Sequence, residues 1–248
     1  MKGARHIYIP DAQVKPGVKT DHLEACGNYI AEKRPDVIVC AGDFADMPSL
    51  NIHKPKGHIT FEGARYLDDI SAANQGMERM VRPFQNIKGY TPKMVLTLGN
   101  HEYRIVRAVQ SDPTLKGTLS LNDLYYEQLG WRVVPFLQPI KINGILYCHY
   151  FVTGVYDKAV SRASKLISLY HQSCVAGHQQ GRDIAYGKHA DGRSITSIIA
   201  GSFYEHKEDY LSPQSNNHWR GIYMLSEVHG GSFDEMAVSL KFLKEKYL

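Results

Sequence analysis

Polar side chains gather at four places where an apolar, strand-like run of the sequence ends. The clusters are Asp11-Ala12-Gln13, Gly42-Asp43-Phe44-Ala45-Asp46, Gly99-Asn100-His101-Glu102, and a later pair made of Cys148-His149-Tyr150 and Gly177-His178-Gln179-Gln180. Ligands bind at the carboxyl ends of strands in open α/β sheets, so these clusters are expected to converge in one crevice. The glycines at positions 42, 99 and 177 let the backbone turn sharply and approach an ion or a phosphate. The residues therefore predict a site for ion or phosphate chemistry.

The hydrophobic pattern indicates which elements position the first three clusters. Apolar runs typical of buried strands occupy residues 6–9, 37–41 and 94–98. Between the first two runs, Asp21 and Glu24 form a capping-box pattern for a helix that ends before Pro35. A second helix is expected over residues 61–82. Strands that alternate with helices in this way indicate a parallel α/β arrangement.

The second half of the sequence consists mainly of short strand-like runs separated by glycines. These runs cover residues 131–134, 140–142, 145–150, 173–176, 195–200, 222–228 and 236–240. The dipeptide Asn143-Gly144 is the signal of a type I′ hairpin, and a helix is expected over residues 158–171. An α/β fold with two packed mixed β-sheets, flanked by helices, accommodates this order.

Size and composition favour one globular domain that spans residues 1–248. Apolar residues make up 43% of the chain and charged residues 22%, which argues against disorder or a fibrous repeat. The net charge of +4 would attract phosphate-bearing substrates without selecting among them. The four cysteines are far apart, with no CxxC pair, and are expected to be reduced thiols. With no signal-peptide pattern and no apolar run of roughly 20 residues, we expect a cytoplasmic protein without membrane contact.

The order of the clusters resembles the five-part pattern of the calcineurin-like metallophosphoesterases. That pattern reads D-x-H, G-D-x-x-D, G-N-H-E, a lone H, and G-H-x-H, and this chain follows it in order from Asp11 to Gln180. The resemblance implies a four-layer αββα sandwich that hydrolyses phosphate esters with the help of metal ions. The sequence around the motifs is also similar to small bacteriophage-encoded members, whose proteins would act in the host cytoplasm.

The resemblance also implies a centre of two divalent cations bridged by the Asp43 carboxylate. One cation would be held by Asp43, Asn100, His149 and His178. The other would be held by Asp43, Asp11, Gln13 and Gln180. A carboxylate, an amide oxygen and two imidazoles, as in the first set, suit manganese, iron or zinc.

The two glutamines depart from the family pattern, which has histidine at both positions. Amide oxygens in place of imidazoles make the second site an all-oxygen site, and such sites suit magnesium, calcium or manganese better than zinc. We therefore expect manganese first, with magnesium, iron, nickel or zinc as alternatives, and a second site that is weak or absent. Either Gln13 and Gln180 bind the ion directly, or they hydrogen-bond to ordered water.

The resemblance assigns the proton transfer to His101, as the general acid that protonates the leaving oxygen. Asp46 would orient His101 and fix its tautomer. Glu102 is interpreted as an acid that either supports the ligands or begins the following helix. Arg104, on that helix, is a candidate for phosphate binding.

Two further segments hold candidate substrate contacts. The connector at residues 47–63 carries His53 and is interpreted either as a substrate-facing lid or as a solvated loop. His206 belongs to a cluster with Tyr204, His218, Trp219 and Arg220. This cluster could stack a base or bind phosphate, or its aromatic rings could be part of the core.

The leading functional expectation is a nuclease-like enzyme that hydrolyses phosphodiesters in nucleic acid or nucleotides, with metal-activated water as the nucleophile. One alternative is a phosphomonoesterase that acts on proteins, nucleotides or 5′ ends. A third is a binding scaffold that has kept the fold and lost catalytic strength. In the enzymatic cases the partner is a phosphate-ester substrate, and the sequence leaves the oligomeric state open.

Overall fold

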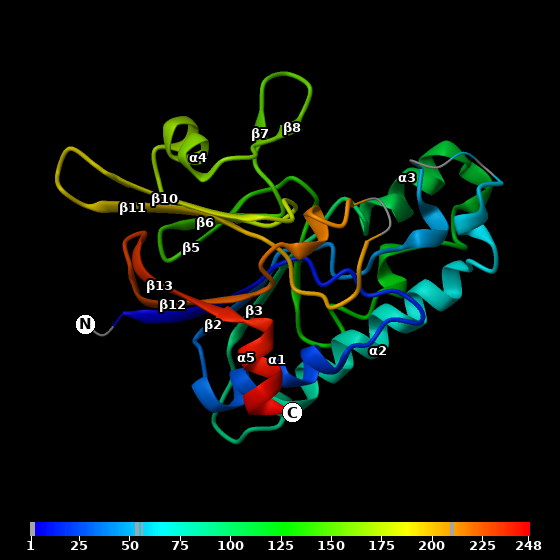
Figure 1. Ribbon diagram of the computed structural model, residues 1–248, viewed down its shortest axis with the longest axis horizontal. Coiled ribbons are helices and arrows are strands. Elements are labelled where there is room, and N and C mark those ends of the chain that lie inside the picture. The colour runs from blue at the N-terminus through cyan, green and yellow to red at the C-terminus, as the bar shows by residue number, and fades with distance from the viewer. Residues whose placement is uncertain (1–2, 53–54, 56, 209–210) are drawn as a thin grey trace.

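The structure, a computed structural model, describes residues 3–52, 55, 57–208 and 211–248 (Figure 1). Its centre consists of two β-sheets. The six-stranded sheet has the spatial order β13 (Ser232–Ser239), β12 (Gly221–His229), β1 (Ala4–Ile9), β2 (Val37–Cys40), β3 (Lys93–Thr97) and β4 (Arg132–Val134). The five-stranded sheet has the order β10 (Arg182–Lys188), β11 (Ser194–Ala200), β9 (Cys174–Ala176), β6 (Ile145–Cys148) and β5 (Ile140–Ile142). Both sheets mix parallel and antiparallel neighbours.

The remaining elements surround these sheets. The helices are α1 (Asp21–Lys33), α2 (Tyr66–Gln85), α3 (Tyr103–Ser111), α4 (Ala163–Tyr170) and α5 (Leu240–Tyr247). Short 3-10 helices occur at η1 (Pro48–Leu50), η2 (Ile59–Phe61), η3 (Pro113–Leu115), η4 (Leu121–Asp123) and η5 (Ser215–Asn217). A small hairpin pairs β7 (Val152–Thr153) with β8 (Lys158–Ala159). Among the residues that the structure describes, no helix has the length and apolar character required to cross a membrane.

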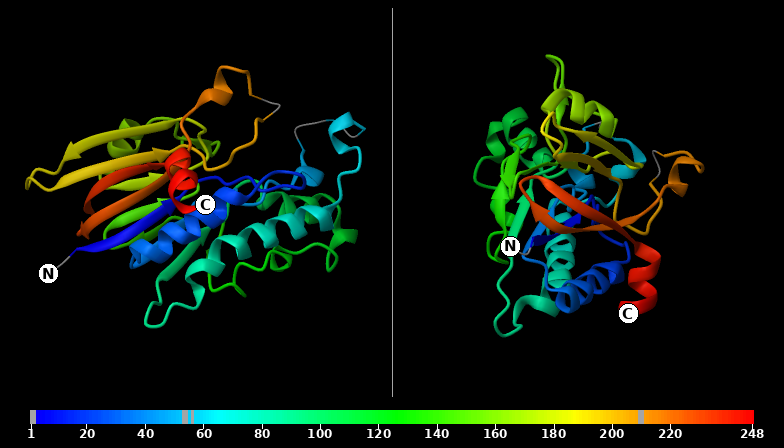
Figure 2. Two further views of the ribbon diagram at one scale, coloured as in Figure 1. Left: turned by 60° about the horizontal axis from the view of Figure 1, so that its bottom comes forward. Right: turned by 90° about the vertical axis from the view of Figure 1, so that its left-hand side faces the viewer.

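Side-chain alternation along the strands produces the layers. Ile7 and Ile9 of β1 pack in the cluster that also holds the apolar faces of α1 and α2, whereas Tyr8 packs in the cluster between the two sheets. On the outer face of the second sheet, Leu166 of α4 packs against residues of β6, β9 and β11, including Cys174. Figure 2 shows α1 and α2 on one side of the paired sheets and α4 on the other. The predicted α/β fold with two packed mixed sheets flanked by helices is therefore confirmed.

Parallel pairing brings the motif loops to one edge of the sheets. Ile9 at the end of β1 is level with Cys40 at the end of β2, and Cys40 is level with Leu96 near the end of β3. In the second sheet, Cys148 at the end of β6 is level with Ala176 at the end of β9. Each of these strands ends just before one of the polar clusters, so the five loops begin side by side.

Several local predictions are confirmed. Asn143 and Gly144 have φ values of 49° and 91°, as a type I′ turn requires, and they connect β5 to β6 with Ile142 opposite Ile145. All four cysteines are buried and form no disulfide.

The structure differs from three sequence predictions about helices. Helix α2 begins at Tyr66 rather than at residue 61, because Gly63 has φ +69° and interrupts the helical backbone. The helix expected over residues 158–171 is confined to α4, since its first two residues belong to β8. The capping box at Asp21 is also wrong: Thr20 is the N-cap residue without a side-chain cap, and Glu24 pairs with Arg79 of α2 at 3.0 Å.

The pattern missed two elements near the C-terminus. The edge strand β10 is half-exposed and lacks the apolar run that marks a buried strand. The run expected at residues 236–240 ends as a strand at Ser239, whose hydroxyl accepts the N–H of Phe242 (3.2 Å) and begins α5.

Candidate metal centre

Hydrogen bonds join the motif loops although they are far apart in the sequence. The N–H of Gln13 donates to the carbonyl of Asp43 (2.9 Å), and the N–H of His101 donates to Asp43 Oδ1 (2.8 Å). The N–H of His178 donates to Asp11 Oδ1 (3.0 Å). The structure thus brings the first, second, third and fifth motifs into direct contact.

Three candidate ligands have a left-handed backbone, with φ values of 43° for Gln13, 45° for Asp43 and 67° for His178. Residues other than glycine adopt this conformation at a cost on the order of 1 kcal/mol or more. In each of the three, the backbone N–H donates to another residue of the site, which for Asp43 is Glu102 Oε2 (2.9 Å). These bonds hold the strained backbone and aim the side chains into the centre.

Two motif glycines permit close approach of carboxylates. A Cβ atom at Gly99 would overlap the carboxylate and backbone of Asp43, and one at Gly177 would overlap the carboxylate of Asp11. The sequence predicted that these glycines make room for an ion or phosphate. The structure shows instead that they make room for the carboxylates.

Glu102 is fully buried and connects the loops of the second and third motifs. Its Oε1 accepts from the N–H groups of Phe44 (2.8 Å) and Ala45 (3.1 Å) and from the Tyr126 hydroxyl (3.2 Å). Its Oε2 accepts from the N–H groups of Asp43 (2.9 Å) and Gly99 (3.0 Å). All five partners are donors, so the geometry corresponds to the ionised carboxylate. Although Glu102 precedes α3, its side chain does not cap that helix.

Four side chains converge as the resemblance implied for one cation. His149 Nε2 lies 3.3 Å from Asp43 Oδ2 and 3.0 Å from Asn100 Oδ1. Ligand atoms of Asp43, His149 and His178 all lie within 4.8 Å of one another. Ligands about 2.1 Å from a shared ion are at most about 4.2 Å apart, so these atoms fit around one divalent cation after small side-chain adjustments.

Electrostatics favour a positive charge at this position. Burial lowers the pKa of His149, but the Asp43, Asp11 and Glu102 carboxylates together outweigh it and raise the pKa to about 9. Burial would raise the pKa of Asp43, but His101 and His149 hold it below its ordinary value. Burial lowers the pKa of His178 to about 4, so this imidazole is neutral and able to bind a metal. A proton on His149 Nε2 points at Asp43 Oδ2 and Asn100 Oδ1. Both oxygens are candidate ligands of one cation, and a bound cation would displace this proton.

The second set of candidate ligands contains oxygens without partners. Asp11 Oδ2 and Gln13 Oε1 are buried and have no hydrogen-bond partner among the described residues. Burial, together with the Asp43 charge, raises the pKa of Asp11 to about 7. An unpartnered buried oxygen costs about 1–3 kcal/mol. A hard cation bound to Asp11 Oδ2 and Gln13 Oε1 would remove this cost for both oxygens. Gln180 Oε1 accepts from the Tyr204 hydroxyl (2.6 Å), which leaves one lone pair of that carbonyl oxygen for another partner.

His101 lies beside this centre with its two ring nitrogens in different contacts. Its Nδ1 is 2.7 Å from Asp46 Oδ1, and its Nε2 is 3.1 Å from Arg104 Nη2 and 3.7 Å from Asp43 Oδ2. Arginine only donates, so in this arrangement Nε2 accepts and Nδ1–H donates to Asp46. Burial lowers the pKa of His101, but Asp43 and Asp46 outweigh it and the net pKa is raised. The ring can therefore take up a proton at Nε2 when Arg104 withdraws.

The two predicted substrate-contact residues that the structure describes, Arg104 and His206, have different surroundings. Arg104 is buried and also donates to the carbonyls of Asp46 (2.8 Å) and Met47 (3.2 Å), so its guanidinium is adjacent to His101. His206 lies against Tyr204 with ring centroids 4.6 Å apart, and its Nε2 is 2.5 Å from Glu208 Oε1. His53 lies outside the described residues.

The contacts of Tyr204 favour the core interpretation for this ring. Tyr204 is fully buried, with the His206 ring stacked on it and the Arg220 guanidinium 4.7 Å from its ring centroid. Arg220 in turn donates to the carbonyls of Glu205 (3.0 Å) and Asn216 (3.2 Å). Protein groups thus occupy the positions where a base would stack.

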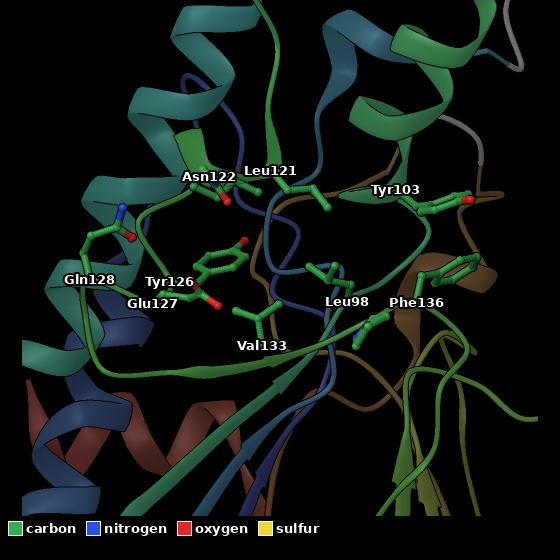
Figure 3. Close-up of a pocket in the computed structure, with 11 residues that line it drawn as sticks. Leu98, Tyr103, Leu121, Asn122, Tyr126, Glu127, Gln128, Val133 and Phe136 are labelled. Carbon is green, nitrogen blue, oxygen red and sulfur yellow. The ribbon is translucent and has the colours of Figure 1, made fainter. Parts of the chain in front are cut away.

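A half-buried row of aromatic rings leads away from the candidate metal ligand His178. Ring centroids are 4.5 Å apart between His178 and Tyr150, 5.6 Å between Tyr150 and Phe136, and 4.8 Å between Phe136 and Tyr103. The Arg107 guanidinium lies 5.4 Å from the Tyr103 ring centroid. We call Tyr150, Phe136 and Tyr103 the aromatic row. Two of its members also line a cavity of about 410 Å³ that lies beside the third motif (Figure 3).

Sequence reasoning missed the contact between Tyr204 and Gln180, and it missed Lys15 and Glu208 altogether. Tyr204 holds Gln180, and Lys15 and Glu208 form an ion pair against Asp46. A signal for Lys15 was present, because polar residues at 11, 13 and 15 alternate with apolar ones at 12 and 14. No comparable local pattern marks Glu208, which reaches the site from the segment after β11.

A profile of the calcineurin-like phosphoesterase family matches residues 16–190 of this sequence. The chain belongs to the calcineurin-like phosphoesterase family. It is therefore a hydrolase that acts on phosphate esters in a metal-dependent reaction. The matched region contains the second to fifth motifs and begins just after Asp11 and Gln13.

Two solved structures are similar over nearly the whole chain. Yfce, a phosphoesterase from E. coli, is 13% identical, with a TM-score of 0.42, and the alignment covers 95% of this chain and 100% of Yfce. A conserved uncharacterized protein from Streptococcus pneumoniae TIGR4, described as a predicted phosphoesterase, is 10% identical with a TM-score of 0.36. That alignment covers 96% of this chain and 99% of the other. No curated protein sequence matches this chain.

Proposed function

We propose that this phosphoesterase hydrolyses phosphodiesters of nucleic acid or nucleotides. The observation that carries the reaction type is the convergence of Asp43, Asn100, His149 and His178 beside the His101–Asp46 pair. Cations bound by these residues would supply the charge that stabilises the transition state and would activate water as the nucleophile. We propose a pair of divalent cations, manganese first among them, with the weaker one at Asp11 and Gln13.

The residues of this chain perform the proton transfer and the orientation. Asp46 accepts Nδ1–H of His101 and keeps the ring turned so that Nε2 faces the centre. Protonated at Nε2, His101 delivers the proton to the leaving oxygen of the ester. Arg104, whose Nη2 now contacts Nε2, turns to the phosphate oxygens when substrate enters, because a guanidinium pairs more strongly with an anion than with neutral imidazole.

The aromatic row supports a substrate that carries bases. Its rings begin 4.5 Å from the metal ligand His178, are half-buried, and end at the cation of Arg107. Aromatic rings interleaved with a basic side chain suit unpaired bases and the phosphates between them, and a stacked base contributes about 1–3 kcal/mol. An alkyl or small aryl phosphate would not reach along this row.

The deciding assay compares a diester with its monoester in manganese, magnesium, nickel and zinc. We expect methyl p-nitrophenyl phosphate to be hydrolysed faster than p-nitrophenyl phosphate. His101→Ala should lower the rate with methyl phenyl phosphate, whose leaving phenolate needs a proton. Absence of turnover with every ion would refute hydrolysis by this site. Faster turnover of the monoester would favour a phosphomonoesterase instead.

A second assay tests the proposed base contacts. Phe136→Leu should raise the KM for a dinucleotide by about 5- to 150-fold, the equivalent of losing one stacked base, without changing it for methyl p-nitrophenyl phosphate. Tyr156→Leu, which changes an 84%-exposed tyrosine outside the row, is the matched control. Equal effects of Phe136→Leu on both substrates would exclude a base-binding role.

One observation favours a weakened enzyme that binds more than it cleaves. Gln180 Oε1 already accepts from Tyr204 and has one lone pair left, so the second set depends mainly on Asp11, Asp43 and Gln13. A single tightly bound manganese with slow turnover of every ester would support this alternative.

A further inference from the structure

Lys15 bridges two buried carboxylates next to the general-acid candidate. Its Nζ is 3.0 Å from Asp46 Oδ2 and 2.9 and 3.0 Å from the two oxygens of Glu208. The Lys15 side chain is 22% exposed, and those of Asp46 and Glu208 are only 10% and 6% exposed. Removing one of these poorly solvated side chains would leave a buried charge without its partner. The ion pairs therefore fix the positions of the side chains more firmly than an exposed surface pair would.

Each oxygen of the Asp46 carboxylate has its own partner. Oδ1 accepts from His101 Nδ1 at 2.7 Å, and Oδ2 accepts from Lys15 at 3.0 Å. Arg104 lies 3.7 Å from Oδ1, but its hydrogen bonds go to backbone carbonyls and to His101. Lys15 is thus the group that holds the distal oxygen and prevents the carboxylate from rotating away from His101.

The backbone on both sides of this bridge is fixed. Val14 forms a parallel bridge with Ala45: its N–H donates to the Phe44 carbonyl (2.7 Å) and its carbonyl accepts from Asp46 N–H (2.9 Å). Glu208, on the other side, donates its N–H to Asn216 Oδ1 (2.9 Å). The ammonium group therefore connects two anchored segments.

We propose that Lys15 is a positioning residue for phosphoester hydrolysis, which aligns His101 through Asp46 and is itself held by Glu208. This inference rests on the proposed role of His101 as the acid.

A direct phosphate contact is the competing role for Lys15, and leaving groups separate the two. A leaving phenolate needs protonation, whereas the weakly basic p-nitrophenolate does not. If Lys15 acts through the acid, Lys15→Met should slow methyl phenyl phosphate by about 10-fold or more and methyl p-nitrophenyl phosphate by less than about 3-fold. A lost phosphate contact would slow both esters equally, and that result would overturn the proposal.

Combining Lys15→Met with His101→Ala provides a second test of the positioning role. In a His101→Ala background, Lys15→Met should cause no further loss, because the group it positions is gone. Lys15→Arg should recover most of the single-variant loss, since it retains the charge. Lys241→Met, which changes a lysine whose side chain is 83% exposed on α5, should change neither rate. A full additional loss in the His101→Ala background would contradict the inference.

A spectroscopic readout decides the question without turnover. The hydrogen-bonded Nδ1–H of His101 should give a downfield proton resonance, assigned by its loss in His101→Ala. It should be lost or shifted in Lys15→Met and in the milder Glu208→Gln, and retained in Lys15→Arg. An unchanged resonance in both Lys15→Met and Glu208→Gln overturns the positioning role. If the unaltered protein hydrolyses neither ester with any cation, the proposed function fails instead, and the resonance still tests the alignment.

Discussion

The substitution Glu102→Gln tests whether one buried carboxylate holds the metal-binding loops together. Glu102 accepts five hydrogen bonds, three at Oε1 and two at Oε2. Glutamine has the same shape but only one acceptor oxygen. The arrangement that keeps most bonds places this oxygen at the Oε1 position. Its NH2 group then faces the N–H groups of Asp43 and Gly99. All three groups are hydrogen-bond donors, so none of them finds an acceptor there.

The expected cost follows from those two backbone groups. Each buried N–H left without an acceptor costs about 1–3 kcal/mol, so Glu102→Gln should lower the free energy of unfolding by about 2–6 kcal/mol. The two affected residues are Asp43, a candidate metal ligand, and Gly99, which packs against the Asp43 carboxylate. Manganese affinity should therefore fall as well, although Glu102 itself is not a candidate ligand.

Urea denaturation with and without manganese measures both effects. The midpoint should fall while the slope with urea stays constant, since the amount of surface exposed on unfolding is unchanged. The exposed neighbour Glu127 provides the control, because Glu127→Gln should change stability by less than about 0.5 kcal/mol. A loss below about 1 kcal/mol for Glu102→Gln, or unaltered manganese binding, would refute the idea that this carboxylate organises the loops.

Three other measurements test separate features of the structure. Burial lowers the pKa of His22 to about 3, so unfolding takes up a proton below its ordinary pKa of 6.5. Stability should fall by about 2 kcal/mol between about pH 7.5 and about pH 5, and His22→Leu should lack this component of the pH dependence in urea titrations. Gly99→Ala should cost about 1–3 kcal/mol and weaken manganese binding in calorimetry, whereas Gly181→Ala, whose Cβ would have open space around it, should preserve stability. The double change Gln13→His with Gln180→His should convert the second site to stoichiometric zinc binding, and an unchanged zinc stoichiometry would contradict the assignment.

The strands and the loops that follow them could be predicted because their signals are local. A buried strand such as β2 is a continuous apolar run, and the next residues, Gly42 and Asp43, interrupt it with residues that suit a sharp turn and an ion. Edge strand β10 is half-exposed and carries no such run. Helix α5 spans only Leu240–Tyr247, and Leu243 is its one buried residue. Their positions depend on neighbouring elements, so the sequence alone could not indicate them.

The same distinction applies to the site. The types and order of the candidate ligands are a property of the sequence, whereas the groups that orient them come from distant segments. Lys15 and Glu208 are 193 residues apart, and Gln180 is held by Tyr204 from a different loop. Glu102 could be singled out as an acid in the third motif, but its role as acceptor of five donors depends on how two loops fold around it.

We propose that the glutamines retuned the second site and did not abolish it. A site that has lost its ion should pair its buried oxygens with protein donors, because each unpaired oxygen costs about 1–3 kcal/mol. At the second site, Gln13 Oε1 and Asp11 Oδ2 stay unpartnered among the described residues, and Gln13 also keeps a left-handed backbone with φ 43°. An oxygen-preferring cation bound by these two oxygens would offset the cost of leaving them unpaired.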